Sequence, residues 1–362
     1  MSTVLLVIGI LSFLIIVHEL GHFLVARFFR VRVEEFGIGY PPRAFTFGRW
    51  GGTEYTLNWL PFGGFVRLFG DVGEGQHGSG SFVDKSRGIQ AIILVAGVFM
   101  NAVAAWALFT GALYLGIPRP VPSAEASASA WLMVAEVLPG SPAFDAGLAP
   151  GDKIAGISGA SGVAPALTPE AVTDFVRERG GEPLEITYER SGTETTVTVR
   201  PAHAVIRDAP IQPAVGIALV LVSTEPLPIL QAVSQGLIST YNAFKTIAVG
   251  LGSIVKDIAS GAPALQDIVG PVGLVGVVGA AADNGLGNVL ALAAFISVNL
   301  VIINLLPIPA LDGGRLFVLG IEAAVRRNAS RLALRFLNTI GIAFVVLLMV
   351  AVTYNDIARL LA

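Results

Sequence analysis

Four long apolar segments decide what this chain can fold into. They lie at residues 1–27, 89–116, 287–312 and 336–356. Each supplies the roughly 20 apolar residues that a helix needs to cross the hydrocarbon core of a bilayer. Apolar residues make up 54% of the 362-residue chain and charged residues only 14%, against about 25% charged in an average soluble protein. The sequence therefore predicts a polytopic α-helical membrane protein with four transmembrane helices in a lipid bilayer.

The stretches between the apolar segments differ in composition and predict different structures. Residues 28–88 are rich in glycine and aromatic residues and predict a β-loop region. Residues 125–205 carry charges, alternating strands and turn signals, which are typical of a small α+β domain. Residues 226–286 include an amphipathic stretch suited to the membrane interface, followed by a loop. Residues 313–335 predict a short helix or loop before the last span.

Basic residues gather in two of these stretches, 28–88 and 313–335. Two predicted spans separate them along the chain, so both stretches lie on the same side of the membrane. Loops rich in lysine and arginine stay on the cytoplasmic side. We therefore expect both termini and the 125–205 domain on the opposite, extracytoplasmic side.

Charge and cysteine content exclude several classes of function. The formal net charge is −3, so there is no basic surplus to bind the phosphate backbone, and we expect no nucleic-acid partner. The chain has no cysteine. This excludes thiolate metal sites and cysteine nucleophiles.

The first apolar segment is interrupted by His18, Glu19 and His22 in the pattern His-Glu-x-x-His. Residues four apart lie on one face of a helix, so the two imidazoles can share a metal ion. Zinc suits imidazole ligands, and the glutamate can deprotonate a zinc-bound water. Ionisable residues inside a membrane span indicate function. The alternative is that the histidines are satisfied core residues and Glu19 is a helix-packing partner.

A third metal ligand has to come from elsewhere in the chain. One other polar cluster accompanies a span, Asn-Leu-Leu-Pro-Ile-Pro-Ala-Leu-Asp-Gly-Gly at 304–314. Its prolines and glycines break the helix at membrane depth, which is tolerated where the opened backbone is buried in protein or lines a wet cavity. Asp312 is then either the third ligand or the N-cap of the next helix, and the residues alone favour neither.

Together the two motifs, His-Glu-Leu-Gly-His and Asn-Leu-Leu-Pro-Ile-Pro-Ala-Leu-Asp-Gly-Gly, resemble the signatures of the site-2 protease family of intramembrane zinc metalloproteases. Within that family the chain is most similar to the regulator of sigma-E protease branch, and the likeness covers nearly the whole chain. The resemblance implies that His18, His22 and Asp312 hold Zn²⁺ and that Glu19 is the general base. It also implies a bacterial inner membrane, with the termini and the 125–205 domain in the periplasm.

The resemblance also assigns a role to two asparagines. Asn304 matches the motif asparagine that holds the substrate backbone or stabilises the oxyanion, and Asn299 matches a second asparagine nearby. An amide donor aimed at the developing oxyanion is what such chemistry needs beside a metal. The alternative is that both amides make helix–helix hydrogen bonds in the membrane, worth about 0.6 kcal/mol each.

Two further stretches resemble parts of the same family. Residues 37–65 resemble its membrane-associated β-hairpin, which presents a strand edge to the substrate, although a plain cytoplasmic hairpin fits the pattern equally well. Residues 137–154 resemble bacterial PDZ domains. This chain has room for one such domain, where the branch commonly carries two. The domain either gates access by bulky ectodomains or receives a peptide as an added strand.

Two short motifs complete the comparison with the family. The second span reads Gly97-Val98-Phe99-Met100-Asn101 where the family often has Gly-Pro-x-x-Asn. The asparagine is kept and the proline is not, which leaves the geometry of this span open. Gly-Pro-Val-Gly at 270–273 also matches the family, and no chemistry is assigned to it.

The predicted function is therefore that of an intramembrane zinc endopeptidase, in which zinc-activated water attacks a peptide bond. Its substrates would be membrane proteins with a transmembrane helix, either anti-sigma factors or remnant signal peptides. One alternative is a catalytically inactive membrane scaffold that recruits partners through its PDZ domain. Another is a membrane zinc protease of a different family, which would need a third ligand outside the Asp312 motif.

Overall fold

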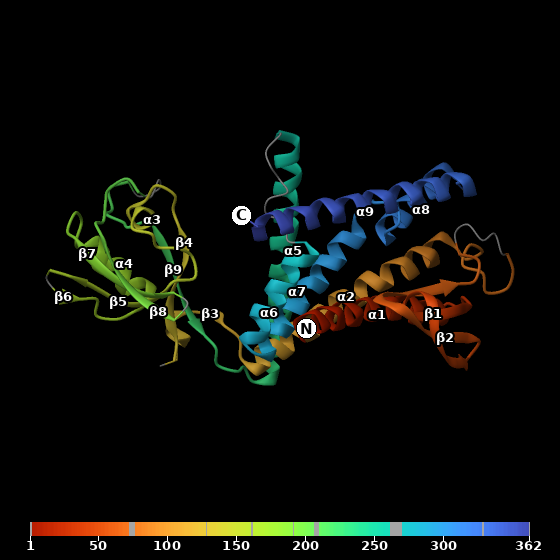
Figure 1. Ribbon diagram of the computed structural model, residues 1–362, viewed down its shortest axis with the longest axis horizontal. Helices are drawn as coiled ribbons and strands as arrows, with labels where there is room; N and C mark the ends of the chain where they lie inside the picture. Colours follow the sequence, from red (N-terminus) through yellow and green to blue (C-terminus); the bar gives the residue numbers. More distant parts are fainter. Residues whose placement is uncertain are drawn as a thin grey trace. The chain divides into compact units, whose positions relative to one another are not determined.

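The computed structural model describes residues 2–71, 77–127, 129–160, 162–190, 192–205, 210–260, 270–327 and 329–361. These form two compact units (Figure 1). The first unit combines Met1–Leu115 with Leu227–Ala362, and the second comprises Gly116–Pro226.

The first unit is built from long helices and one pair of strands. Within the described residues, four helices are long and apolar enough to cross a membrane: α1 (Ser2–Phe28), α2 (Arg87–Leu115), α7 (Leu286–Leu305) and α9 (Arg331–Leu361). The predicted set of four apolar helices is therefore confirmed. The other helices are α5 (Ile229–Ser260), α6 (Pro271–Asp283) and α8 (Asp312–Val325).

Small residues bring these helices close together, as is typical of helices that pack in lipid. A Cβ atom on Gly21 of α1 would overlap the backbone carbonyl of Ala96 on α2. Between α2 and α7, the buried Ser297 donates a hydrogen bond of 2.8 Å to the backbone carbonyl of Asn101. Helix α5 runs against α2, where Trp106 donates its indole N–H to the carbonyl of Val233 at 2.9 Å.

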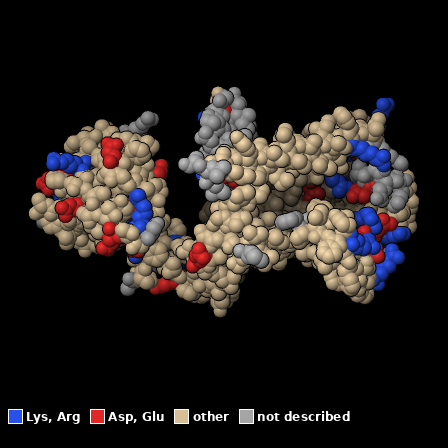
Figure 2. Space-filling model, in the orientation of Figure 1, with Lys and Arg blue, Asp and Glu red and all other residues tan. Residues whose placement is uncertain are grey.

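The outer surface of the first unit is strongly apolar. On α9, Leu332, Phe336 and Leu347 are 81%, 66% and 69% exposed. Figure 2 shows that charged side chains are sparse over the helices on this face and gather at the end that carries β1 and β2. Such a surface is suited to lipid rather than to water.

The segment predicted as the third span, 287–312, is helical only in part. Helix α7 ends at Leu305, and the chain is not helical again until Asp312 opens α8. The prolines at 307 and 309 lack the N–H groups that a continuing helix needs. Ala310 adopts a φ of +80° and donates its N–H to Oδ1 of Asn338 on α9 at 3.2 Å. This broken segment carries Asp312 toward α1.

Strands β1 (Val33–Trp50) and β2 (Thr53–Leu68) form the β-loop region. Each strand bends back on itself: Gly37 of β1 is paired with both Phe65 and Thr56 of β2, and Thr56 is paired with both Gly37 and Thr46 of β1. The first half of β1 therefore lies between the two halves of β2. The last part of β2 lies beside α1, where a Cβ on Gly64 would be 3.5 Å from Cγ of Glu19.

The second unit is a sheet in the order β3-β9-β4-β5-β7-β8, with β6 paired to β5. Its core includes the fully buried Leu132, Val134, Leu184 and Ile186. Its elements are β3 (Arg119–Val121), the 3₁₀ helix η1 (Ser123–Glu125), β4 (Trp131–Val137), α3 (Pro142–Asp145), β5 (Lys153–Gly159), β6 (Gly162–Val163), α4 (Pro169–Arg177), β7 (Leu184–Arg190), β8 (Thr193–Val199) and β9 (Ile217–Ser223).

This unit extends beyond the range 125–205 expected from the sequence. Strand β9 lies between β3 and β4, and both β3 and β9 fall outside that range. The sequence of β9, Ile-Ala-Leu-Val-Leu-Val-Ser, is a continuous apolar run. Such a run is compatible with a buried strand or with part of a helix, so its pattern did not assign it to the sheet.

Candidate metal centre

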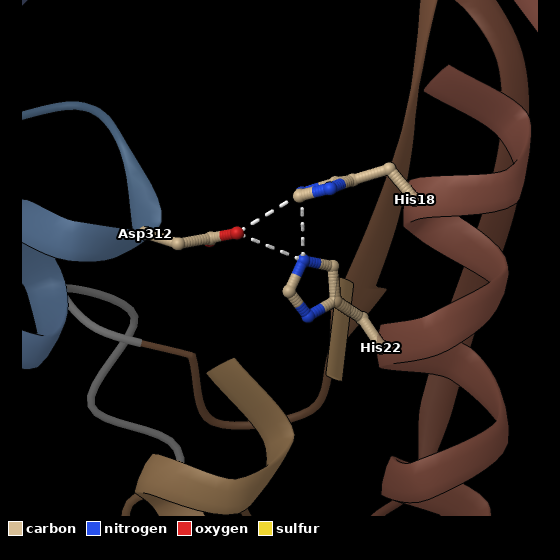
Figure 3. Close-up of side chains that lie close together, drawn as sticks. All are labelled: His18, His22 and Asp312. Carbon is tan, nitrogen blue, oxygen red and sulfur yellow. Dashed lines mark hydrogen bonds and ion pairs between the residues drawn. The ribbon is translucent and has the colours of Figure 1, made fainter. Parts of the chain in front are cut away.

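Three side chains converge inside the first unit. His18 and His22 point from consecutive turns of α1, and Asp312 reaches them from the start of α8 (Figure 3). Oδ2 of Asp312 lies 3.0 Å from Nε2 of His18 and 3.1 Å from Nε2 of His22. The two Nε2 atoms are 3.1 Å apart. Three potential ligand atoms therefore form a nearly equilateral triangle.

The broken segment before α8 fixes Asp312 in place. Gly313 and Gly314 are buried, and Cβ atoms on them would overlap the backbone at Leu306 and Ile308. The two glycines thus let the first turn of α8 lie directly on the end of α7. Asp312 is the first residue of α8 and Leu311 is its N-cap. A carboxylate in the first turn is favoured by the helix dipole.

These three residues fit a zinc ion. Tetrahedral zinc with bonds of roughly 2.0–2.1 Å separates its ligand atoms by about 3.3 Å, which is close to the triangle of 3.0 to 3.1 Å. Two imidazoles and one carboxylate also make a typical donor set for catalytic zinc, leaving a fourth position open. Within the described residues, this is the one group of three or more such side chains that could hold a metal.

Helix α2 shapes the space around the two imidazoles. Nδ1 of His22 lies 2.8 Å from the carbonyl oxygen of Ile93. One turn further along α2, a Cβ on Gly97 would lie 2.8 Å from Cε1 of His18 and would overlap His22. The absence of a side chain at Gly97 therefore makes room for both rings.

Comparison with known proteins matches this chain to a family of peptidases. The family model described as peptidase family M50 matches residues 6–348. The chain belongs to peptidase family M50. The family predicted from the two motifs, the site-2 proteases, is thereby confirmed.

Relatives of this M50 peptidase match over its whole length. A Clostridium perfringens protein, provisionally named a zinc metalloprotease, is 36% identical over 346 residues, which are 96% of each chain. The regulator of sigma-W protease RasP of Bacillus subtilis is 28% identical and covers 99% of each chain. Among solved structures, the PDZ domain of an SdrC-like protein from Listeria monocytogenes is 19% identical, with a TM-score of 0.22, and covers 26% of this chain and 92% of that domain.

The M50 peptidase carries Glu19 beside the converged ligands. A cavity of about 190 Å³ is lined by Glu19 together with His18, His22 and Asp312. Val66, near the end of β2, lines the same cavity, and a Cβ on Gly64 would lie 3.5 Å from Cγ of Glu19. Glu19 therefore lies between α1 and the β-loop, next to the three converged side chains.

An ion pair borders the same cavity. Arg315, in the first turn of α8, donates to the carboxylate of Asp71, which follows β2, and both residues line the cavity. The guanidinium of Arg315 also lies 5.6 Å from the centre of the Phe82 ring. These contacts tie the helix that carries Asp312 to the β-loop that contacts Glu19.

The two asparagines expected at the site have different surroundings. Asn299 on α7 donates to the carbonyl of Phe295 in its own helix at 3.0 Å. Asn304 lies near the end of α7 and is half-buried. Among the residues the structure describes, no hydrogen bond joins either amide to the three converged ligands. Their roles toward substrate stay predictions.

The residues that sequence reasoning missed lie on α2. Gly97 and Asn101 match a family motif that here lacks its proline, and the sequence alone assigns them no role. Asn101 is fully buried and its Nδ2 lies 3.3 Å from Nδ1 of His18. A signal was present, because a glycine and an asparagine four apart in an uncharged span indicate a close approach and a buried polar contact.

Proposed function

We propose that this M50 peptidase is an intramembrane zinc endopeptidase that cleaves membrane proteins within or beside a transmembrane segment. Family membership and the names of its relatives make it a zinc metalloprotease. The observation that carries the proposal is the convergence of His18, His22 and Asp312 beside Glu19 within a bundle of apolar helices.

The residues of the centre are proposed to have different roles in peptide-bond hydrolysis. His18, His22 and Asp312 would hold zinc, which when bound supplies a Lewis acid that activates water and polarises the scissile carbonyl. Glu19 takes the proton of the attacking water and delivers it to the leaving amide. Asn304 and Asn299 are proposed to orient the substrate or stabilise its oxyanion.

The β-loop supports the delivery of an extended substrate. A protease cleaves an extended chain, so a helical substrate has to unwind and lose its backbone hydrogen bonds. Pairing with a strand edge replaces them. The end of β2 lies beside Glu19, where Gly64 and Val66 line the same cavity and a Cβ on Gly64 would be 3.5 Å from Cγ of Glu19, so a segment paired near it would lie close to the general base.

The proposal also covers the orientation of the chain in the membrane and the role of the second unit. Family and apolar helices point to a multi-pass bacterial membrane protein. We place the β-loop and α8 on the cytoplasmic side of the inner membrane, and both termini and the Gly116–Pro226 unit in the periplasm. We interpret that unit as a PDZ domain that gates access by bulky ectodomains. One relative is named a regulator of sigma-W protease, which supports anti-sigma factors as substrates, and remnant signal peptides are the other class.

The decisive experiment is cleavage of a single-span test substrate in detergent. We expect the wild-type protein to cleave it, and expect both a zinc chelator and the Glu19→Gln substitution to abolish cleavage. Glu19→Gln should still bind zinc, because Glu19 is not one of the three ligands. Cleavage by Glu19→Gln at the wild-type rate would contradict the proposed chemistry. Zinc-loaded wild-type protein that cleaved no substrate, even one without an ectodomain, would favour the inactive scaffold.

A further inference from the structure

One face of α2 is directed at the metal centre. Ile93, Gly97 and Asn101 are spaced four residues apart and so lie along one side of the helix. The carbonyl of Ile93 lies 2.8 Å from Nδ1 of His22, and the amide of Asn101 lies 3.3 Å from Nδ1 of His18. On each imidazole, the ring nitrogen that faces away from Asp312 therefore lies beside a polar group of α2.

Asn101 is buried in a way that leaves one polar atom without a partner. The residue has no exposed surface, and its Oδ1 has no hydrogen-bond partner among the described residues. Its backbone is held in place, because Ser297 donates to its carbonyl oxygen at 2.8 Å. An unpaired buried carbonyl oxygen is destabilising, so this oxygen is a candidate for use in another state of the site.

The position of the proton on a metal-bound imidazole indicates what that state is. A neutral imidazole carries one proton, so a ring that binds a metal through Nε2 keeps its proton on Nδ1. Metal-binding histidines donate this N–H to a carbonyl, carboxylate or water, which fixes the tautomer and the ring orientation. His22 has the carbonyl of Ile93 as its acceptor. His18 has only the Asn101 amide beside its Nδ1 among the hydrogen bonds of the described residues.

We infer that Asn101 is a positioning residue of the metal centre, whose amide oxygen accepts the Nδ1–H of His18 and so presents Nε2 of that ring to zinc. A half-turn of the amide about its Cβ–Cγ bond exchanges Oδ1 with Nδ2 and brings the oxygen to His18. In the opposite tautomer, Nε2 of His18 donates to Asp312 at 3.0 Å and Nδ1 accepts from Nδ2 of Asn101. The Asn101 amide can therefore hydrogen-bond to either tautomer of His18, with Oδ1 as the acceptor for one and Nδ2 as the donor for the other.

This inference rests on the proposed function, because it takes zinc as the ligand. Two substitutions separate hydrogen bonding from packing. Asn101→Asp keeps an acceptor for the Nδ1–H, whereas Asn101→Leu keeps the same number and branching of side-chain heavy atoms and has no acceptor. Thr110→Val is the matched control, because Thr110 also lies on α2 and its buried Oγ1 also has no partner among the described residues.

The test is zinc affinity, measured by chelator competition on the full-length protein in detergent. We expect Asn101→Leu to weaken zinc binding by about 10- to 100-fold, Asn101→Asp to bind zinc at least as tightly as wild type, and Thr110→Val to leave affinity unchanged. The visible absorption bands of bound Co²⁺ should shift in Asn101→Leu alone. Thermal unfolding without metal reports whether each variant is folded.

The outcomes separate this inference from the proposed function. Wild-type protein that bound no zinc would overturn the proposed function, and this inference with it. Zinc-binding wild type with equal affinity in Asn101→Leu would overturn the inference alone. Equal losses in Asn101→Leu and Asn101→Asp would also overturn it, since they would mean that the site requires the shape of asparagine and not an acceptor.

Discussion

Gly97 lies against the imidazole of His22 so closely that no side chain fits between them. A Cβ atom at Gly97 would lie 2.7 Å from Cε1 of His22 and 2.8 Å from Cε1 of His18. Because His18 and His22 are the two proposed imidazole ligands, the position of α2 decides whether their Nε2 atoms can lie next to Asp312.

Gly97→Ala should therefore impair the metal centre. The added methyl has to displace both rings, and a misplacement of ~1 Å can cost about a hundred-fold in activity. We expect at least a ten-fold loss in zinc affinity, measured by chelator competition, and a larger loss of cleavage. Gly88→Ala is the control, because a Cβ at Gly88 of the same helix meets nothing within 4 Å. Equal zinc affinity in the two variants would show that the rings have room to move.

The sequence predicted the convergence of the three candidate ligands unequally well. The spacing of His18 and His22 places both on one helix face by geometry alone. Asp312 lies 294 residues after His18, with its Oδ2 3.0 Å from Nε2 of His18, and only the family resemblance favoured it over a helix cap. The role of Gly97 follows from which helix lies against α1. No local pattern specifies that neighbour, because all the spans are similarly apolar.

Zinc removal should lower the stability of the protein. A ligand that binds only the folded state stabilises it by about 4 kcal/mol at a thousand times its Kd. We expect zinc to raise the midpoint of thermal unfolding in detergent and a chelator to reverse the rise. Asp312→Asn should lose this increase, since it removes the charged ligand. Asp283→Asn, at an exposed residue of α6, should keep it. A zinc-dependent increase that survived Asp312→Asn would exclude Asp312 as a ligand.

Glu35 holds the bent β-loop together. Its buried carboxylate contacts Arg43 at 2.8 Å, Arg67 at 2.9 Å and the hydroxyl of Thr56 at 2.8 Å. Glu35→Gln would leave both half-exposed arginines without this charge, so we expect a loss of about 1–3 kcal/mol. Glu54→Gln, which loses one contact of 3.2 Å to Arg43, should cost less.

The readout is hydrogen exchange of the paired β1 and β2 amides in the full-length protein, which should speed up in Glu35→Gln. Cleavage should fall as well, because the end of β2 lies beside Glu19. Unchanged exchange in Glu35→Gln would mean that the strand pairing alone holds the loop.

The β-loop and the second unit mark the limit of sequence reasoning about the strands. Glycine and aromatic residues indicated a hairpin at 37–65, but the double pairing of Gly37 with Phe65 and Thr56 depends on where each strand bends. Strand β9 joins β4 from about 80 residues further along the chain. The uniform apolar run of β9 does not indicate which strands it pairs with. The sequence therefore predicts that the second unit ends at residue 205, before β9.

Acid should weaken the second unit through Asp152. Burial alone would raise the pKa of this carboxyl, but hydrogen bonds from Arg190 at 2.6 and 2.8 Å and from the N–H of Ala149 at 2.8 Å bring its pKa below the usual value. A lowered pKa in the folded state stabilises the protein above the unfolded pKa of about 3.9. This stabilisation is lost as the pH falls through the folded pKa.

We expect the stability difference between wild type and Asp152→Asn to be constant near neutral pH and to shrink below about pH 4. Hydrogen exchange of the β4 and β5 amides in the full-length protein, followed against pH, measures it. Asp145→Asn in the same unit is the control for the removal of one carboxylate charge. A difference for Asp152→Asn that stayed constant to pH 2 would show that the ion pair does not couple to folding.

Asp356 should hold the start of α6 to the end of α9. Its buried carboxylate accepts N–H groups from Gly270 at 3.0 Å, Val272 at 3.1 Å and Gly273 at 2.8 Å. These donors belong to the Gly-Pro-Val-Gly motif, for which the sequence suggested no role. Because the first N–H groups of a helix lack partners within it and carry positive charge, a carboxylate is the acceptor best suited to them.

Asp356→Asn removes the charge and leaves a single acceptor oxygen, so we expect a loss of about 1.5–3 kcal/mol at this contact. Hydrogen exchange at Val272 and Gly273 should then become at least about ten-fold faster, while exchange in the Gly116–Pro226 unit stays the same. Gly270→Ala should act alike, since a Cβ there would lie 2.6 Å from Oδ2 of Asp356. Asp283→Asn at the other end of α6 is the control. Protection of Val272 and Gly273 that survived Asp356→Asn would mean that packing of α6 on α1 and α7, and not the carboxylate, holds this helix.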